Sequence, residues 1–370
     1  MLRSLTKWFM FLGLFLSTAL YADAVVSSSS TVSSSSTVSS SDMVLSSSDM
    51  VLSSETVASA EVTSNLQAES QQERLSLTPI GWLKKMTSAF SELNYDGTFV
   101  HTGQNRLNSM RIRHGLIGGV EYESLEDLDG ADVTLIRVDD SLICISPDEA
   151  ALNASAFWNQ PFSRFRKLDE ERLKVGYHIK QSAKKVRIAG RYATIIQLIP
   201  KDEHRFGHGF WLDRETGFLL KHDMYDRKGH LLERTQFASL SLNPDLKVTD
   251  FTPNKDSYKV SFESEPPQEV ANSWKFDWLP DGFDMVWSKA HLIRNGAHML
   301  LLSDGMATVS VFVEPTRKDV PMHMMSRGAT YAGERTMIIQ GNRYLLTLVG
   351  EVPPVTIETL MSVFMPKATP

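Results

Sequence analysis

Apolar residues recur at two different spacings along this chain, and the change of spacing predicts where helix gives way to strand. Leu83, Met86, Phe90 and Leu93 lie three to four positions apart, which places them on one face of a helix. Thr78 and Pro79, just before them, are a typical N-cap and first-turn pair. The pattern therefore predicts a helix that begins near Pro79 and extends through Leu93.

After this helix, apolar and polar residues alternate, as they do in strands with one buried face. Short runs rich in β-branched and aromatic residues are separated by turn-forming Gly, Asp and Asn. The runs cover residues 98–101, 110–114, 134–138, 142–145, 186–188, 192–199, 210–212, 218–225 and 230–242. We expect an antiparallel meander of roughly eight strands with helix on one side. The less regular stretch 147–176 is expected to hold loops and a helix or two.

A second group of strands follows a connection with three prolines and mixed charges, residues 247–271, which we interpret as an interdomain linker. Its strands are expected at residues 283–291, 299–303, 307–313, 332–339 and 344–349. Pro353 and Pro354 open a last helix, whose apolar stripe is Ile357, Leu360, Met361 and Phe364. The predicted fold class is α+β, with a larger antiparallel domain at residues 78–246 and a smaller antiparallel sheet domain with a C-terminal helix at residues 272–366.

The first residues predict export. Arg3 and Lys7 flank an apolar run at residues 8–20, and Ala22 and Ala24 bracket Asp23 in the small-x-small form of a signal-peptidase site. We expect a cleaved signal peptide at residues 1–24; the alternative is an uncleaved anchor, although the run is shorter than the roughly 20 residues that a membrane span needs. Residues 25–77 are repetitive and Ser-rich, so we expect a disordered low-complexity segment.

Composition removes several classes of function. The chain has 370 residues, 42% of them hydrophobic, and a formal net charge of −6, which gives little electrostatic support to nucleic-acid binding. Its single cysteine, Cys144, lies in an apolar strand and is expected to be a small buried side chain rather than a nucleophile. The sequence has no G-x-S-x-G, no phosphate-binding Gly loop with Lys and no H-E-x-x-H. We therefore expect a binding protein that is not an enzyme and holds no cofactor or metal.

A scattered hydrolase site is the enzymatic alternative. His204 and His208 are four residues apart, but glycines interrupt the segment and no third ligand is near, so unligated histidines are favoured over a metal pair. Three carboxylate clusters occupy turns or solvated faces: Asp139 with Asp140, Glu170 with Glu171, and Asp213 with Glu215. The best catalytic candidates would be His204, His208 and Asp213.

A half-buried sheet with a helix on one face can enclose an apolar cavity. The side chains expected to line such a lipid cavity are Phe99, Met110, Ile112, Trp211, Phe218, Leu220 and Phe237. The alternative, favoured for any one of them, is that they fill the core, because alternation does not distinguish a cavity from a core.

Several sequence blocks resemble one family. In the first domain they are Leu93-Asn94-Tyr95-Asp96-Gly97-Thr98-Phe99-Val100, Met110-Arg111-Ile112-Arg113-His114, Leu128-Asp129-Gly130 and Trp211-Leu212-Asp213-Arg214-Glu215-Thr216-Gly217. In the second they are Trp278-Leu279-Pro280-Asp281-Gly282-Phe283, Ser303-Asp304-Gly305 and Val349-Gly350-Glu351-Val352-Pro353-Pro354. Their order and spacing, over about residues 79 to 366, resemble the RseB/MucB family of periplasmic negative regulators of the extracytoplasmic-stress sigma factor.

The resemblance implies that the larger domain is an unclosed antiparallel β-barrel with helices, like the carrier proteins LolA and LolB. It implies a periplasmic protein of the envelope stress response that binds the periplasmic domain of a membrane anti-sigma factor of RseA/MucA type. That binding would shield the anti-sigma factor from site-1 proteolysis until a lipid, lipopolysaccharide or mislocalised lipoprotein signal releases it.

We expect the partner to bind mainly on the second domain and the linker. The candidate contact residues are Trp278, Leu279, Pro280, Gly282 and Phe283. The alternative, slightly favoured, is a domain-entry turn with a core aromatic. A second functional hypothesis is a lipid or lipoprotein carrier or sensor without a sigma-pathway partner. The sequence leaves open whether the protein forms a homodimer.

Overall fold

The computed structural model describes residues 77–103, 106–129, 133–139, 141–146, 162–252, 258–262, 268–293 and 296–367. The predicted signal peptide and, apart from Leu77, the Ser-rich segment lie outside these ranges. Within them, no helix is both long enough and apolar enough to cross a membrane.

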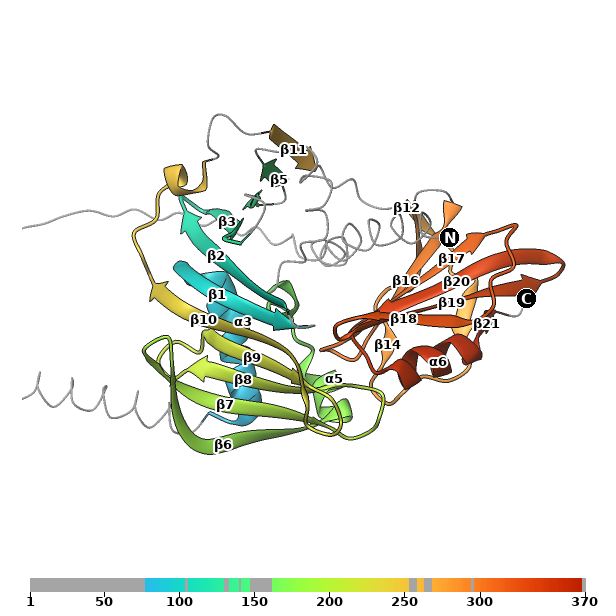
Figure 1. Ribbon diagram of the computed structural model, residues 1–370, viewed down its shortest axis with the longest axis horizontal. Helices are drawn as coiled ribbons and strands as arrows, with labels where there is room; N and C mark the ends of the chain where they lie inside the picture. The colour runs from blue at the N-terminus through green and yellow to red at the C-terminus, as the bar shows by residue number, and fades with distance from the viewer. Residues whose placement is uncertain are drawn as a thin grey trace, which may run out of the picture. The chain divides into compact units, whose positions relative to one another are not determined.

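Eleven antiparallel strands form an open sheet that, with its helices, we call the N-terminal domain (Figure 1). The strands are β1 (Tyr95–Gly103), β2 (Arg106–Ile117), β3 (Val120–Asp127), β4 (Thr134–Val138), β5 (Ser141–Ser146), β6 (Tyr177–Ile188), β7 (Arg191–Pro200), β8 (Gly207–Asp213), β9 (Leu219–Tyr225), β10 (Leu231–Leu242) and β11 (Tyr258–Phe262). Their order is β11-β5-β4-β3-β2-β1-β10-β9-β8-β7-β6. Because β11 and β6 end this order without pairing with each other, the sheet is unclosed, as predicted.

The expected number of strands was too low, for two reasons. Strand β3 was missed because Glu123 and Ser124 interrupt its apolar pattern, yet both are buried, at 4% and 1% exposure. Strand β11 lies inside the predicted linker and pairs with β5, so residues 247–271 contribute to the first sheet as well as connecting the domains.

Helix α3 (Pro79–Glu92) confirms the predicted first helix, and Leu93 is its C-cap. The Thr78 side chain accepts a hydrogen bond from the Gly81 N–H at 3.1 Å, as an N-cap does. The buried side chains of α3 face the sheet, against which the helix lies in Figure 1. The structure also describes three short helices in this domain: η2 (Ser163–Phe165), α5 (Glu170–Gly176) and η3 (Val248–Phe251).

A second antiparallel sheet and helix α6 (Pro354–Val363) form what we call the C-terminal domain (Figure 1). Its strands are β12 (Gln268–Val270), β14 (Asp284–Met285), β15 (Ala290–Leu292), β16 (His298–Ser303), β17 (Thr308–Pro315), β18 (His323–Arg327), β19 (Thr330–Ile339) and β20 (Asn342–Gly350). The order is β12-β15-β16-β17-β20-β19-β18, with β14 paired to β16. Strands β13 (Trp274–Phe276) and β21 (Phe364–Pro366) form a separate pair.

The stripe predicted for the last helix is buried: Ile357, Leu360 and Met361 lie on α6, and Phe364 follows it in β21. The single strand predicted at residues 283–291 is wrong. The chain leaves β14 after Met285, and the Trp287 ring packs on the His291 ring with centroids 3.9 Å apart. Burying Trp287 therefore takes precedence over continuing the strand.

Candidate functional site at the contact between the two domains

Arg205, in the segment between β7 and β8, extends from the N-terminal domain into the C-terminal domain. Its guanidinium donates to the Asp304 carboxylate at 3.1 Å and to the Asp281 carbonyl at 2.6 Å, both in the C-terminal domain. It also donates to Asp202 of its own domain, at 3.1 and 2.9 Å. Arg205 is 1% exposed and Asp304 0%, so this ion pair between the domains is fully buried.

Hydrogen bonds and aromatic rings around this ion pair compensate the burial of both charges. Two backbone N–H groups of the turn after Asp304 donate to its other carboxylate oxygen, at 2.9 and 2.7 Å. Burial raises the pKa of Asp304, and the charge of Arg205 opposes that rise. The rings of Tyr177 and Phe283, one from each domain, lie 5.5 and 5.2 Å from the guanidinium carbon. A Cβ on Gly176 would overlap the Arg205 guanidinium, so only glycine leaves room for it.

Two glycine turns of the C-terminal domain fit against α5. Gly282 (φ +85°) would place a Cβ 3.3 Å from Val175, and Gly305 (φ +91°) would place one 2.7 Å from the Asp169 carbonyl oxygen. Both positions combine a left-handed backbone with close approach, which glycine tolerates best. Two of the sequence blocks therefore meet one short helix of the other domain.

Further polar contacts surround the ion pair. Arg172 on α5 donates to the Ser303 carbonyl at 3.1 Å, and the Thr356 hydroxyl on α6 donates to the His204 carbonyl at 3.0 Å. The Trp278 ring packs edge-on against the His204 ring, with centroids 5.1 Å apart. Hydrogen bonds of this kind depend on direction, so they specify one arrangement of the two domains.

An apolar cluster and a second ion pair complete the contact. Phe206 and Met224 pack with Ala329, which lies in the turn between β18 and β19. Arg164 on η2 forms an ion pair with Glu351, at the end of the C-terminal sheet. The contact between the domains thus combines buried charge, apolar packing and a half-buried ion pair.

Two buried histidines lie beside this contact. His208 Nδ1 and His222 Nε2 are 3.1 Å apart, and the two rings stack with centroids 5.3 Å apart. Burial, with a smaller contribution from the charge of Arg164, lowers the pKa of His208 to about 3. The same causes, with smaller contributions from His208 and His101, place the pKa of His222 well below its ordinary value. Both rings are therefore neutral at neutral pH, and one donates to the other.

The predicted cavity residues form a filled face. Five are at most 2% exposed, namely Phe99, Ile112, Phe218, Leu220 and Phe237, whereas Met110 and Trp211 are half-buried. Phe90 from α3 contacts Phe218 at 5.0 Å between ring centroids, and Phe162 stacks on Phe237 at 5.5 Å. Trp211 lies elsewhere, with the Lys221 ammonium 3.9 Å from its ring. Aromatic side chains of α3 and of the segment 162–165 thus pack against this face.

The predicted partner-binding residues lie at or beside the domain contact. Phe283 and Gly282 contact Arg205 and Val175 as described above, and Pro280 is buried and accepts the Phe283 N–H at 3.0 Å. Leu279 packs on the C-terminal core, and Trp278 remains 42% exposed. The structure therefore brings these five residues together, largely against the N-terminal domain.

The three candidates for hydrolytic chemistry, His204, His208 and Asp213, each contact different residues. Asp213 binds Arg191 at 2.9 Å and accepts the Thr216 N–H at 3.0 Å, which is the turn role predicted for it. His204 contacts Thr356, whereas His208 contacts His222. Cys144 is buried, as expected. Across the residues described, no group of three or more His, Cys, Asp and Glu side chains could hold a metal ion.

Sequence reasoning missed a charged network in the N-terminal domain. Glu121 accepts hydrogen bonds from His114 at 2.9 Å and from Arg137 and Arg166 at 2.6 Å each. Burial would raise the pKa of Glu121, but these hydrogen bonds and charges outweigh it and hold that pKa far below its ordinary value. Arg166 also pairs with buried Glu123. The network anchors Arg166 two residues after Arg164, which reaches the other domain.

Arg205 and Asp304 were also missed as a pair. Asp304 was noted only as part of the block Ser303-Asp304-Gly305, and nothing around Arg205 distinguishes it from a surface arginine. The one local sign in the sequence is Gly176. The need for glycine at that position can be understood only from the structure, in which the Arg205 guanidinium packs against it.

Comparison with known proteins agrees with this two-domain architecture. The sequence model of the MucB/RseB N-terminal domain matches residues 78–255, and that of the MucB/RseB C-terminal domain matches residues 268–364. The sigma factor AlgU regulatory protein MucB of Pseudomonas aeruginosa is 30% identical over 78% of this chain and 90% of its own length. The sigma-E factor regulatory protein RseB of Haemophilus influenzae is 31% identical over 73% of this chain and 86% of its own.

The structure of the Pseudomonas aeruginosa MucA/MucB complex contains a chain with a TM-score of 0.64 and 28% identity, which covers 78% of this chain and 98% of that chain. A crystal structure of MucB in complex with the periplasmic part of MucA gives a TM-score of 0.63 at 26% identity, over 79% of this chain and 100% of that chain. The relatives are regulatory proteins, in agreement with the prediction that this chain is not an enzyme. The two domain matches, in order and over most of the chain, show that it belongs to the MucB/RseB family.

Proposed function

We propose that this protein is a periplasmic regulator that binds the periplasmic domain of a transmembrane anti-sigma factor of RseA/MucA type and shields it from site-1 proteolysis. The observation that carries the proposal is the family match over both domains, together with the likeness to MucB chains solved with MucA. Export by a cleaved signal peptide at residues 1–24 is part of the proposal.

The protective mechanism is steric. A protease cleft takes its substrate as an extended segment, so a partner segment held against this protein cannot enter it. Trp278, exposed beside the domain contact, is the first residue to test as a partner contact. A partner that touches both domains would bind one arrangement of them better than others, so its affinity depends on the contact around Arg205.

The segment 162–166 supports a route by which lipid could release the partner. Phe162 and Phe165 fill the apolar face, Arg164 pairs with Glu351 of the C-terminal domain, and Arg166 is held by the charged network. A lipid chain that displaced the two phenylalanines would also move Arg164 away from Glu351. It would favour a second domain arrangement only by the difference in its affinity for the two.

A pull-down with the periplasmic segment of the anti-sigma factor from the same genome tests the binding. Digestion of that segment by the site-1 protease, with and without this protein, tests the shielding. We expect capture and protection, and Trp278→Ala should weaken both while leaving the melting temperature unchanged. A folded protein that neither captures nor protects the segment would contradict the proposal and favour a lipid carrier.

Lipid release needs its own measurement. Addition of lipopolysaccharide or of lipoprotein acyl chains to the protected complex should restore cleavage. Arg164→Met should release the partner at lower lipid concentration, because one link between the segment and the C-terminal domain is then absent. Release that Arg164→Met does not alter would show that the segment 162–166 does not carry the signal.

A further inference from the structure

Positive charge is concentrated at one edge of this acidic protein. Residues 172–201 contain eight Lys and Arg and no Asp or Glu, whereas the chain as a whole has a formal net charge of −6. These residues form the end of α5, strands β6 and β7 and the start of the following loop. Strand β6 is the last strand of the sheet order, so this charge lies along an open edge.

Most of these basic side chains have no acidic partner. Arg172, Lys174 and Arg191 pair with carboxylates. The other five are paired with no carboxylate in the described part of the chain, and we call them the basic edge: Lys180, Lys184, Lys185, Arg187 and Lys201. Among the described residues, the exposed side chains of Lys180, Lys184 and Lys185 make no hydrogen bond or ion pair. The Arg187 side chain donates to the Gly190 carbonyl at 2.7 Å, and the Lys201 side chain also donates to a backbone carbonyl.

Exposed apolar side chains accompany this charge. Tyr192 is 60% exposed and Ile199 is 38% exposed, and both lie on β7 beside the basic edge. The Arg187 guanidinium covers the Tyr192 ring at 5.4 Å. Cationic groups with amphipathic aromatic side chains between them suit an interface that has anionic headgroups above an apolar layer.

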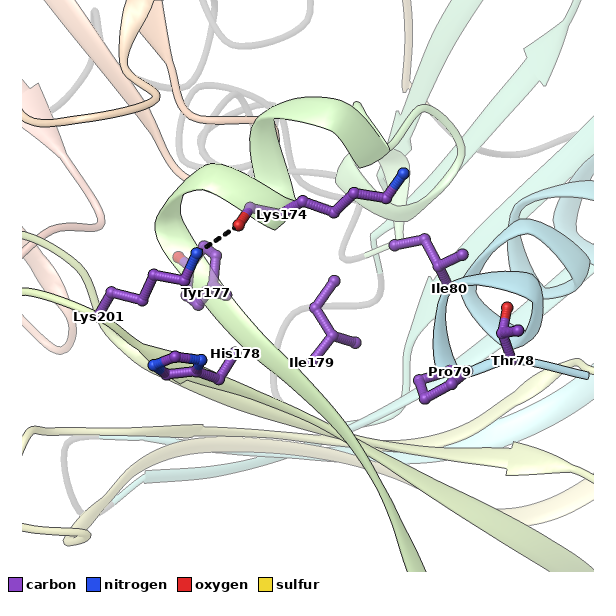
Figure 2. Close-up of a pocket in the computed structure, with 8 residues that line it drawn as sticks. All are labelled: Thr78, Pro79, Ile80, Lys174, Tyr177, His178, Ile179 and Lys201. Atoms are coloured by element: carbon purple, nitrogen blue, oxygen red, sulfur yellow. Dashed lines mark hydrogen bonds between the residues drawn. The ribbon is translucent and has the colours of Figure 1, made fainter.

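A hollow of about 310 Å³ lies at the beginning of β6 (Figure 2). Lys174, His178 and Lys201 supply its polar lining, and Ile80 and Ile179 are among its apolar residues. The Lys201 ammonium donates to the Lys174 carbonyl at 2.6 Å, which positions Lys201 at this hollow. The basic edge therefore ends at a depression with both cationic and apolar walls.

The backbone of β6 argues against an added peptide strand as the occupant. The pairing of β6 with β7 shifts register between Ser182 and Val186, so the edge does not present a regular ladder of hydrogen-bonding groups. Bulges and lysines on an edge strand are devices that oppose strand addition. A broad anionic surface needs no such ladder, and its charge complements the basic edge.

We propose that the basic edge docks this protein onto an anionic phospholipid bilayer. Strand β6 is about 36 Å long, at roughly 3.3 Å per residue, so several headgroups can contact it at once. Because the rest of the chain is acidic, the same electrostatics repel other faces and favour one orientation at the membrane. The docking goes beyond partner binding and requires neither the anti-sigma factor nor the domain contact.

Vesicle co-sedimentation of the purified exported protein tests the proposal. The vesicles are phosphatidylcholine alone, or phosphatidylcholine with one quarter phosphatidylglycerol. The edge variant carries Lys180→Gln, Lys184→Gln, Lys185→Gln and Arg187→Gln. The matched control makes the same change of net charge at scattered exposed positions, Lys228→Gln, Lys247→Gln, Lys318→Gln and Arg343→Gln.

We expect binding to the anionic vesicles only, weakened as salt is raised. The edge variant should partition at least about tenfold more weakly, whereas the control should change much less. Equal weakening of both variants would show that net charge alone matters, and equal binding to neutral vesicles would remove the electrostatic basis. Either result overturns the proposal. Thermal melting confirms that both variants fold.

The lipid-free pull-down separates this proposal from the function proposed above. Wild type and edge variant should capture the anti-sigma segment equally. An edge variant that keeps vesicle binding but loses the segment would assign the basic edge to the protein partner and overturn the membrane proposal. Failure of wild type to capture the segment would leave the vesicle result standing by itself.

Discussion

The apolar face of the N-terminal sheet and the contact between the domains are held by opposite kinds of interaction. Across the face, Phe90, Phe162 and Phe218 pack ring against ring with full burial. At the contact, by contrast, the charged pair of Arg205 and Asp304 is fully buried. Apolar burial is non-directional and stabilises a domain by itself. A buried ion pair contributes little net stability but allows few geometries.

This difference suggests which region can rearrange. Opening the contact exposes charges that water can solvate again, so its cost is limited. Opening the apolar face exposes large aromatic surfaces to water, each worth about 2–3 kcal/mol. We therefore expect the domains to separate under conditions in which each domain remains folded.

The largest expected effect comes from the apolar face. Phe218→Ala should lower the free energy of unfolding of the N-terminal domain by about 3–5 kcal/mol, because it removes a fully buried ring between Phe90 and Phe237. Urea denaturation followed by tryptophan fluorescence measures this. Tyr192→Ala, at a side chain that is 60% exposed, is the control and should change stability little. Similar losses in the two variants would mean that the face is not tightly packed in solution.

A smaller effect, confined to the contact, is expected from Asp304→Asn. The substitution leaves Arg205 buried with only Asp202 as its anionic partner, at a cost of about 3 kcal/mol. Small-angle scattering should show a larger radius of gyration, while each domain keeps its own unfolding transition. Adding Arg205→Met should reverse most of the loss, since no unpaired charge then remains.

The exposed pair of Lys289 and Glu269, at 2.6 Å, gives the matched control for this ion pair. Glu269→Gln should leave stability and dimensions unchanged, because exposed ion pairs contribute little. Asp304→Asn with unchanged dimensions would show that the apolar cluster around Ala329 holds the domains together without the ion pair.

Lowering the pH should destabilise the protein through the buried histidines that lie beside the domain contact. The pKa of His208 is lowered to about 3 in the folded protein, so the unfolded chain binds protons more readily below the ordinary histidine pKa of 6.5. The contribution of neutral His208 to the stability of the folded protein is therefore complete above pH 6.5. It is lost as the pH falls toward 3, and about 2 kcal/mol is lost by pH 5. Melting curves at pH 7.5 and pH 5.0 measure the loss.

Replacing both members of the pair, with His208→Leu and His222→Leu, should reduce this pH dependence, whereas His178→Gln at the surface should not. Half-buried Glu233 has the opposite effect on stability as the pH falls, because partial burial and the nearby charge of Glu351 raise its pKa. Comparison between variants removes that contribution. Equal pH dependence in wild type and the double variant would contradict the assignment to the histidines.

The smallest expected effect is that of Gly305→Ala. The backbone there has φ +91°, and a Cβ would lie 2.7 Å from the Asp169 carbonyl, so we expect a loss of about 1–2 kcal/mol that affects only the contact. Gly118→Ala has a similar backbone penalty, at φ +63°, but no atom within 4 Å. Scattering and melting of the two variants separate the contact from the backbone strain. Equal losses of stability in the two variants would show that α5 moves to accommodate the added Cβ.

Local patterns in the sequence predicted the elements well where one face is apolar. The cap at Thr78, the stripe on α6 and the turn around Asp213 follow from residues within a few positions of one another. The alternation pattern did not predict strand β3, because the charged Glu123 occupies a buried position. Its partner there is Arg166, which is more than 40 residues away in the sequence. Prediction from pattern therefore fails where a charge is buried against a distant partner.

By itself, the sequence determined two antiparallel domains with flanking helices, a non-enzymatic character and membership of one regulatory family, because periodicity and motif order are properties of neighbouring residues. Only the tertiary structure decided that the predicted cavity residues are packed by Phe90 and Phe162, and that Gly282 and Phe283 meet the other domain. It also brought Arg205 to Asp304, across 99 residues of chain. Such pairs depend on how whole sheets meet, and no local spacing encodes that.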